Sequence, residues 1–125
     1  MRRTALISIV DDNEAMRVAT EGLVRSLGYQ AAMFASAEEF LQSDSVDNTS
    51  CLIADVQMPG LTGIDLLRGL TARGIRVPTI FITAFPEEGT RLDALTAGAV
   101  GYLSKPFSEE SLLKCLDRAL GSSDG

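Results

Sequence analysis

The stretch that decides the fold is Cys51-Leu52-Ile53-Ala54-Asp55-Val56-Gln57-Met58-Pro59-Gly60, in which four apolar residues lead directly into Asp55. A short apolar run without polar alternation is typical of a strand buried on both faces of a parallel sheet. The stretch therefore predicts an inner strand over Cys51–Ala54, with the carboxylate of Asp55 at its carboxyl end.

Four more apolar runs of this kind occur along the chain, and amphipathic stretches separate them. Strict alternation of strands and helices predicts a parallel sheet with helices on both faces. Right-handed crossovers then favour a doubly wound α/β fold, the flavodoxin-like (βα)5 arrangement with strand order 2-1-3-4-5. The five strands are predicted at Ala5–Val10, Ala31–Phe34, Cys51–Ala54, Pro78–Ile82 and Val100–Leu103.

The first two helical stretches carry their own start and stop signals. Apolar residues recur at three- and four-residue spacing from Met16 to Leu27, and Gly28 follows as a helix stop. The run Ser36-Ala37-Glu38-Glu39 has the form of a capping box and predicts a short helix through Leu41.

Three more helices are predicted in the second half of the chain. One runs from Thr62 or Gly63 to about Ala72. Pro86 suits the first position of the next helix, because its missing N–H has no helical partner there. Ser108 caps the last helix, whose apolar face is formed by Leu112, Leu113, Leu116 and Leu120.

The composition limits the partners of the chain. Its 125 residues fit one domain, and a formal net charge of -6 makes nucleic acid a poor partner for the chain alone. No apolar run approaches the roughly 20 residues that cross a bilayer, and no signal peptide is visible. We therefore expect a cytoplasmic protein without membrane contact, in which Cys51 and Cys115 are reduced.

The sequence contains no histidine. This absence excludes His-based acid–base catalysis, Ser–His and Cys–His nucleophile pairs and His-containing metal sites. Any chemistry must therefore use carboxylates, lysine, hydroxyls and backbone groups.

Side chains suited to phosphate or cation chemistry follow four of the five predicted strands. Asp11 and Asp12 follow the first strand, Asp55 the third, Thr83 the fourth, and Lys105 comes shortly after the fifth. Two like charges about 4 Å apart repel by ~4 kcal/mol at an effective dielectric constant near 20, so three carboxylates need a cation or raised pKa values. Oxygen ligands without His or Cys favour Mg²⁺, with Mn²⁺ as the alternative.

Each of these residues alone would be an ordinary loop or surface residue, and only the set suggests a function. Asp55 lies at the predicted switch point of the sheet and is the best candidate for a nucleophile that forms an aspartyl phosphate. Lys105 can place its charge on phosphoryl oxygens, and Thr83 can donate a hydrogen bond. Phosphoryl transfer needs mainly positioning and charge neutralisation, which this set supplies without a histidine base.

Four motifs, in this order and spacing, resemble the signature of the receiver domains of bacterial two-component response regulators. The motifs are Asp11-Asp12, Asp55–Gly60, Ile82-Thr83-Ala84 and Lys105-Pro106-Phe107. The likeness covers residues 4–120 and includes Ala97-Gly98-Ala99 and Tyr102. Residues 121–125 are expected to form a flexible tail, or the start of a linker to an output domain that these residues do not contain.

The resemblance implies a role for each residue of the site. Asp12 and Asp55 would bind Mg²⁺ directly, together with the backbone carbonyl of Gln57. Asp11 would act mainly through water. The phosphoryl group would be held by Thr83, Lys105 and the backbone N–H of Ala84.

The resemblance also implies how the domain signals. A sensor histidine kinase or a phosphotransfer protein would donate the phosphoryl group, and the domain would be a switch rather than a turnover enzyme. Thr83 and Tyr102 would then move inward and change the face formed by the fourth helix, the fifth strand and the fifth helix. The output would be transcription control or a protein partner, including a phosphorylation-dependent homodimer through the fourth helix and fifth strand.

Two flanking residues and one peptide bond complete these expectations. The Lys105–Pro106 bond resembles one that is usually cis in the family. Gln57 and Phe85 lie two residues beyond Asp55 and Thr83, where the family controls how water reaches the phosphoaspartate. A bulky Phe85 and an uncharged Gln57 predict slow self-hydrolysis, although Phe85 could instead only pack at the start of the fourth helix.

Four alternatives share part of this pattern. A flavin-binding relative of flavodoxin would offer neutral, hydroxyl-rich loops to its phosphate, and a dinucleotide-binding module would need a Gly-x-Gly-x-x-Gly run that is absent after the first strand. A small aspartate-dependent phosphatase would carry its nucleophile in an Asp-x-Asp motif, whereas Asp11 and Asp12 are adjacent. A degenerate receiver that serves only as a binding module would lack part of the acidic and Thr/Lys set.

Overall fold

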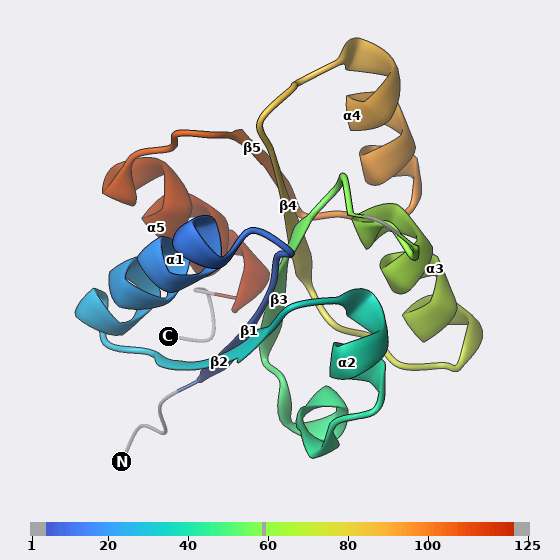
Figure 1. The fold of residues 1–125 in the computed structure, drawn as a ribbon, viewed down its shortest axis with the longest axis horizontal. Coiled ribbons are helices and arrows are strands. Elements are labelled where there is room, and N and C mark those ends of the chain that lie inside the picture. The colour runs from blue at the N-terminus through green and yellow to red at the C-terminus, as the bar shows by residue number, and fades with distance from the viewer. Residues whose placement is uncertain (1–4, 59, 122–125) are drawn as a thin grey trace.

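The chain forms a five-stranded parallel sheet with helices on both faces, and the computed structural model describes residues 5–58 and 60–121 (Figure 1). The strand order is β2-β1-β3-β4-β5, which confirms the predicted flavodoxin-like α/β topology. In chain order the elements are β1 (Leu6–Val10), α1 (Glu14–Ser26), β2 (Gln30–Phe34), α2 (Ala37–Leu41), the 3₁₀ helix η1 (Asp44–Asn48), β3 (Cys51–Asp55), α3 (Gly63–Ala72), β4 (Thr79–Thr83), α4 (Glu88–Thr96), β5 (Gly101–Ser104) and α5 (Glu109–Ala119). Every predicted strand forms, to within one residue at each end. The predicted tail falls largely on residues 122–125, which lie outside the described residues.

The sheet separates two apolar cores. Helices α1 and α5 cover one face, and α2, α3 and α4 cover the other (Figure 1). Ile9 and Ile53 belong to the core under α1 and α5, whereas their neighbours Val10 and Ala54 belong to the core on the opposite face. All five residues of β3 are buried, so both faces of the central strand select apolar side chains.

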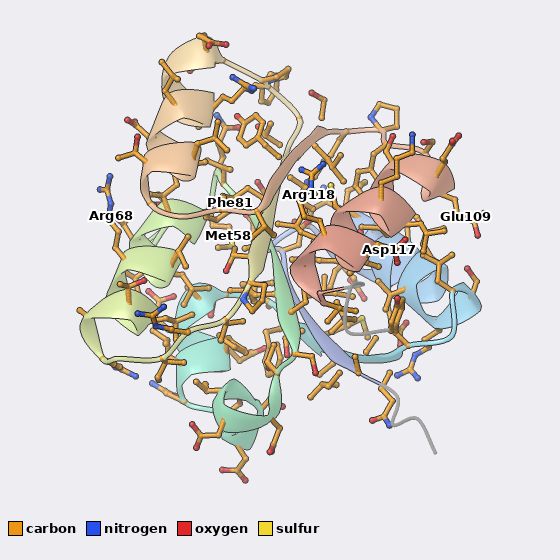
Figure 2. All side chains as sticks on the ribbon, turned by 180° about the vertical axis from the view of Figure 1, so that it is seen from behind. Met58, Arg68, Phe81, Glu109, Asp117 and Arg118 are labelled. Carbon is orange, nitrogen blue, oxygen red and sulfur yellow. The ribbon has the colours of Figure 1, made fainter. Side chains whose placement is uncertain are left out.

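Charged side chains extend outward from the helices, as the view from behind shows (Figure 2). Arg68 projects from α3 away from the sheet, whereas the ring of Phe81 on β4 lies inside the molecule and is fully buried. Among the described residues, no helix is both long and apolar enough to cross a lipid bilayer.

The strand register places the predicted polar residues at one edge. Val10 of β1 is level with Ala54 of β3, so Asp11 follows β1 where Asp55 ends β3. Asp55 is in turn level with Ile82 of β4, so Thr83 ends β4 at the same edge. The parallel sheet thus gathers residues that are far apart in the sequence.

Helix starts differ in detail from the sequence patterns. The Ser36 hydroxyl caps α2 by accepting from the N–H of Glu39, but the Glu39 carboxylate accepts from Ala35 and not from Ser36, so the predicted capping box is incomplete. A complete capping box is found at α3, where Thr62 and Asp65 exchange both hydrogen bonds.

The predicted start of the fourth helix is wrong by two residues. Glu87 is still extended, with φ -127° and ψ 143°, and α4 begins at Glu88 rather than at Pro86. The preceding turn is held by the Thr83 hydroxyl, which accepts from the N–H of Phe85 at 3.0 Å, so the helix starts only after this turn. Glu87 makes no side-chain capping bond, and Ala94 is the one buried residue of α4.

The 3₁₀ helix η1 has no counterpart among the predicted elements. A pair of hydroxyls attaches it to the sheet, because Ser8 Oγ and Thr49 Oγ1 lie 2.7 Å apart and Thr49 Oγ1 donates to the carbonyl of Ser45 at 2.6 Å. Five residues of 3₁₀ helix show no apolar periodicity, which is why the sequence pattern did not indicate this element.

Gly63, the first residue of α3, lets the helix start directly against the end of β3. A Cβ atom at Gly63 would lie 2.5 Å from the backbone oxygen of Asp55 and 3.0 Å from the ring of Phe81. Backbone atoms cannot yield at such a distance, so only glycine allows α3 to pack this closely beside Asp55.

We predict that Gly63→Ala lowers the free energy of unfolding by about 1–3 kcal/mol, the usual cost of an overpacked site. Gly69→Ala in the same helix is the matched control, because a Cβ at Gly69 meets no atom within 4 Å. That control should gain about 0.5–1 kcal/mol, since alanine is the better helix former. Urea unfolding followed by far-UV circular dichroism measures both values, and equal effects at the two positions would contradict the argument.

Candidate functional site

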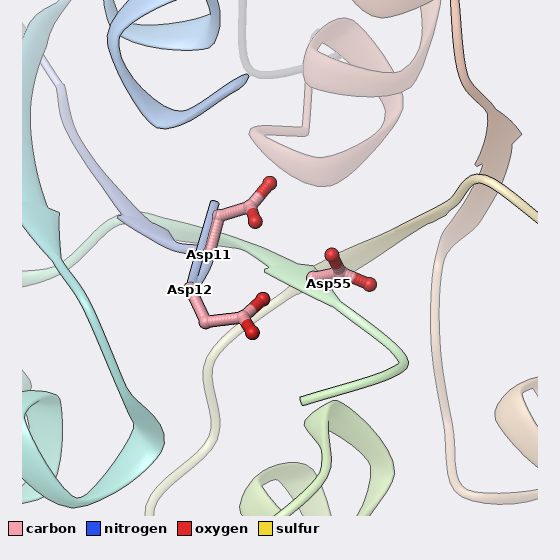
Figure 3. Close-up of side chains that lie close together, drawn as sticks. All are labelled: Asp11, Asp12 and Asp55. Atoms are coloured by element: carbon pink, nitrogen blue, oxygen red, sulfur yellow. The ribbon is translucent and has the colours of Figure 1, made fainter. Parts of the chain in front are cut away.

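Three carboxylates meet at the carboxyl edge of the sheet. Asp11 and Asp12 come from the end of β1 and Asp55 from the end of β3 (Figure 3), and one carboxylate oxygen of each residue lies within 4.8 Å of the others. Asp11 and Asp55 are buried, whereas Asp12 is exposed. The cluster is therefore anchored in the protein on one side and open to solvent at Asp12.

The ammonium group of Lys105 bridges the two buried carboxylates. Its Nζ donates to Oδ2 of Asp55 at 2.9 Å and to Oδ2 of Asp11 at 3.2 Å, and only 11% of the side chain is exposed. Burial alone would lower the pKa of Lys105, but the hydrogen bonds and negative charges of Asp55 and Asp11 raise it above its ordinary value. Lys105 is therefore charged and offsets part of the repulsion in the cluster.

Asp11 is surrounded by hydrogen bonds. Its N–H donates to the carbonyl of Phe34, its Oδ1 accepts from the N–H of Asn13 at 2.9 Å, and its backbone carbonyl accepts from Arg17 Nη1 at 2.7 Å. Burial nevertheless raises the pKa of the Asp11 carboxyl, because the bonds from Asn13 and Lys105 compensate only in part. The negative charge of Asp11 is thus costly in the metal-free protein.

Both oxygens of Asp55 are hydrogen-bonded. Lys105 occupies Oδ2, and Oδ1 accepts from the backbone N–H of Gln57 at 2.9 Å. On the neighbouring strand Thr83 is fully buried, and its backbone carbonyl accepts from the N–H of Lys105 at 2.7 Å. The carboxyl ends of β3 and β4 and the residue after β5 thus form one connected group.

Three residues assigned from the sequence lie at the rim of this group. Gln57, Ala84 and Phe85 are all exposed, and 67% of Phe85 is open to solvent. So exposed a residue has little packing at the start of α4.

Tyr102 lies on the edge strand β5, on the side of the sheet that α4 covers. Its ring packs against the core that contains Phe81 and Ala94, and its hydroxyl is buried without a hydrogen-bond partner among the described residues. The Lys105–Pro106 peptide bond, which follows β5, is cis.

Asn13 and Arg17 contact the site but are not indicated by the motifs. Asn13 carried one usable signal, since an Asn directly before an amphipathic helix is a preferred N-cap, and its Oδ1 does accept from the N–H of Met16. Arg17 carried no signal in the sequence for such a contact, because a single arginine in the second turn of a helix is usually a surface residue.

The donor atoms fit a hard divalent cation. The cluster offers carboxylate oxygens without nitrogen or sulfur ligands, and Asp12 leaves an open side for the waters that Mg²⁺ retains. A cation there would also relieve the repulsion that Lys105 offsets only in part.

The comparison with known proteins gives the family. A sequence model of the response regulator receiver domain matches residues 7–117. The chain belongs to this family. This receiver domain is 42% identical over 109 residues to nodulation protein W of Bradyrhizobium diazoefficiens, covering 87% of this chain and 48% of that protein. It is 40% identical over 118 residues to the response regulator protein TodT of Pseudomonas putida, covering 94% of this chain and 52% of TodT.

Solved structures agree with this assignment. The crystal structure of FixJ-N matches with a TM-score of 0.87 and 32% identity, over 96% of both chains. A response regulator receiver protein from Burkholderia phymatum matches with a TM-score of 0.82 and 39% identity, over 94% of this chain and 96% of the other.

Membership in the family defines the general activity. The receiver domain is part of two-component signalling and is a phosphoacceptor switch rather than an enzyme. The group Asp11, Asp12 and Asp55 is the acidic site typical of Mg²⁺ binding in this family. The chain spans about half the length of the relatives it matches.

The raised pKa of Asp11 predicts a pH-dependent gain in stability for Asp11→Asn. Because the folded state binds the Asp11 proton more tightly than the unfolded state, wild-type stability falls as pH rises through the interval above the ordinary value of 3.8. In EDTA at neutral pH, Asp11→Asn should therefore have the larger free energy of unfolding, and the difference should shrink as the pH falls toward 3.8. Urea unfolding of both proteins at several pH values between 3.8 and neutral measures this difference in the free energy of unfolding. Asp93→Asn on the exposed side of α4 is the control, and an Asp11→Asn variant that is less stable at neutral pH would contradict the prediction.

Proposed function

We propose that Asp55 accepts a phosphoryl group from a sensor histidine kinase or a phosphotransfer protein in a Mg²⁺-dependent reaction. The observation that carries this proposal is the position of its carboxylate at the end of the central strand, 2.9 Å from Lys105 and within 4.8 Å of the oxygens of Asp11 and Asp12. A cytoplasmic location, with access to such a kinase, belongs to the proposal.

The transfer is a displacement at phosphorus. An oxygen of Asp55 forms the new P–O bond, the P–N bond to the donor histidine breaks, and the electron pair of that bond stays on the imidazole nitrogen. Bound Mg²⁺, or Mn²⁺ in its place, would reduce the negative charge of the reacting groups. Asp12, Asp55 and the Gln57 backbone carbonyl would hold it, and Asp11 would contribute mainly through water.

The groups that would hold the phosphoryl oxygens are Lys105, Thr83 and the backbone N–H of Ala84. Lys105 already lies at Oδ2 of Asp55, so a phosphoryl group there would meet a positive charge without a large movement. The Thr83 hydroxyl would donate its proton to the new oxygens, because its own oxygen already accepts from the N–H of Phe85.

The switch would act through β4, α4 and β5. Phosphorylation adds about -1.5 to -2 charge, which attracts Thr83 and Lys105 and draws the β4–α4 turn toward Asp55. Helix α4 suits this movement, since Ala94 is its one buried residue and Glu87 provides no cap. An open groove of about 490 Å³ separates α4 from the β3–α3 loop. Tyr102 would change its packing under α4 at the same time.

The output side of the proposal rests on exposed apolar residues and on the relatives. Leu92 and Leu95 of α4 are 52% and 42% exposed, which supports a phosphorylation-dependent homodimer through α4 and β5. Relatives about twice as long include a protein named transcriptional regulatory protein FixJ, so we propose transcription control or a protein partner as the output of a longer regulator. Residues 4–120 would be the receiver unit in such a protein.

The central test is phosphorylation by acetyl phosphate and Mg²⁺, read by intact-protein mass and by the molar mass in solution. Wild type should gain a single stoichiometric phosphoryl group and shift toward a dimer. Asp55→Asn should gain none, because a weakly nucleophilic amide replaces the carboxylate, and EDTA should prevent the reaction in wild type.

The control for this test is Asp44→Asn, an exposed carboxylate at the start of η1 that does not belong to the site, which should react like wild type. An undiminished adduct on Asp55→Asn would refute the assignment of the acceptor. Multiple turnover on aryl phosphates would instead favour the aspartate-dependent phosphatase.

We further predict that Phe85→Ala shortens the lifetime of the phosphorylated state several-fold. Phe85 is 67% exposed two residues after Thr83, where its ring would crowd the approach of water to the phosphoaspartate, and the neutral Gln57 does not activate water. Loss of the phosphoryl group after removal of acetyl phosphate is followed by mass. The control is Leu113→Ala, which removes an exposed apolar side chain from α5 and should leave the lifetime unchanged. An unchanged lifetime in Phe85→Ala would contradict the shielding hypothesis.

A further inference from the structure

Arg17 reaches from α1 back to the carboxyl end of β1. Side chains of a helix lean toward its N-terminus, which brings this guanidinium to the site edge, where Nη1 donates to the backbone carbonyl of Asp11 at 2.7 Å. We propose that Arg17 is a positioning residue for the cation site, because it fixes the peptide group between Asp11 and Asp12. This inference rests on the proposed Mg²⁺-dependent function and names a residue that supports it.

Asp12 depends on this peptide group for its direction. It is exposed, and its carboxylate has no hydrogen bond to any of the residues the structure describes. The side chain and N–H of Asp11 are held by Lys105, Asn13 and Phe34, whereas its carbonyl is held by Arg17. Rotation of the Asp11–Asp12 peptide would turn Asp12 away from Asp55, and the bond from Arg17 opposes this rotation.

Charge and position predict opposite effects when Arg17 is replaced. Removing a positive charge beside three carboxylates makes the cluster more negative, which by itself strengthens the binding of a divalent cation. Loss of the bond that directs Asp12 weakens binding, since groups that orient metal ligands typically contribute about 10–100-fold to affinity. Weaker binding of the cation by an Arg17 variant therefore indicates a positioning role, because the loss of charge alone would strengthen binding.

Arg25 offers a matched control on the same helix. Its Nη2 also donates to a backbone carbonyl, that of Ala31 at 3.0 Å, and its Nε pairs with Glu21 at 2.8 Å. Arg25 thus bonds to a strand carbonyl as Arg17 does, but the carbonyl belongs to β2 and lies away from the three carboxylates. Arg25→Met removes one positive charge and one such bond without affecting the site.

The first measurement is Mg²⁺ binding by isothermal titration calorimetry on the full chain. Arg17→Met should raise the Kd about ten-fold, Arg17→Lys should lie between it and wild type, and Arg25→Met should leave the Kd unchanged. A Kd for Arg17→Met equal to or below that of wild type would overturn the proposal, as would an equal rise in Arg25→Met. If Arg17→Met does not fold, Arg17→Lys decides, because it keeps the charge and loses the planar fork of donors.

The second measurement needs no metal. In EDTA, hydrogen exchange of the Asn13 N–H, which bonds to Asp11 Oδ1, should be several-fold faster in Arg17→Met than in wild type and unchanged in Arg25→Met. Unchanged exchange in Arg17→Met would refute the positioning role. If wild type binds no Mg²⁺, the proposed function fails, while this exchange experiment still decides the role of Arg17.

Discussion

The site depends on the ion pairs that Lys105 makes with Asp11 and Asp55. A parallel sheet brings the ends of β1 and β3 to one edge, so the fold itself forces carboxylates into close proximity. Burial is the main cause of the raised pKa of Asp11, and the nearby charge of Asp55 adds to it, while Lys105 compensates only in part. A divalent cation bound at this edge would therefore lower the cost of holding these carboxylates together.

The helices on the two sides of the site differ in how tightly they are packed and capped. On the side of β1, β3 and α3, Gly63 packs against the Asp55 carbonyl, five residues of α3 are buried, and a complete capping box holds its start. On the side of α4, the helix lacks a cap and buries Ala94 alone. Such a division would keep the Asp55 carboxylate fixed while the element beside Thr83 responds, as the proposed switch requires.

The sequence predicted the topology, the strand bounds and the gathering of the acidic residues, because apolar runs and strand ends are local signals that the fold combines in only one way. It could not predict features that depend on single contacts in space. The start of α4 follows from a hydrogen bond between Thr83 and Phe85, and the role of Arg17 follows from its reach to a backbone carbonyl. The sequence likewise does not show that position 63 requires glycine, because this depends on the Asp55 carbonyl that lies beside it in the folded protein.

The buried hydroxyl of Tyr102 limits how stable this packing of α4 and β5 can be. A buried polar group without a partner costs about 1–3 kcal/mol, and a ring turned outward would return that hydroxyl to water. Packing of the ring against the core that contains Phe81 and Ala94 opposes this cost, so the two effects offset each other in part. A small free-energy difference between the inward and outward arrangements is the condition under which charge added at Asp55 can shift the population, since a ligand moves an equilibrium only by its differential affinity for the two states. In the proposed switch, this hydroxyl would link the chemistry at the end of β3 to the shape of the face that α4 and β5 present.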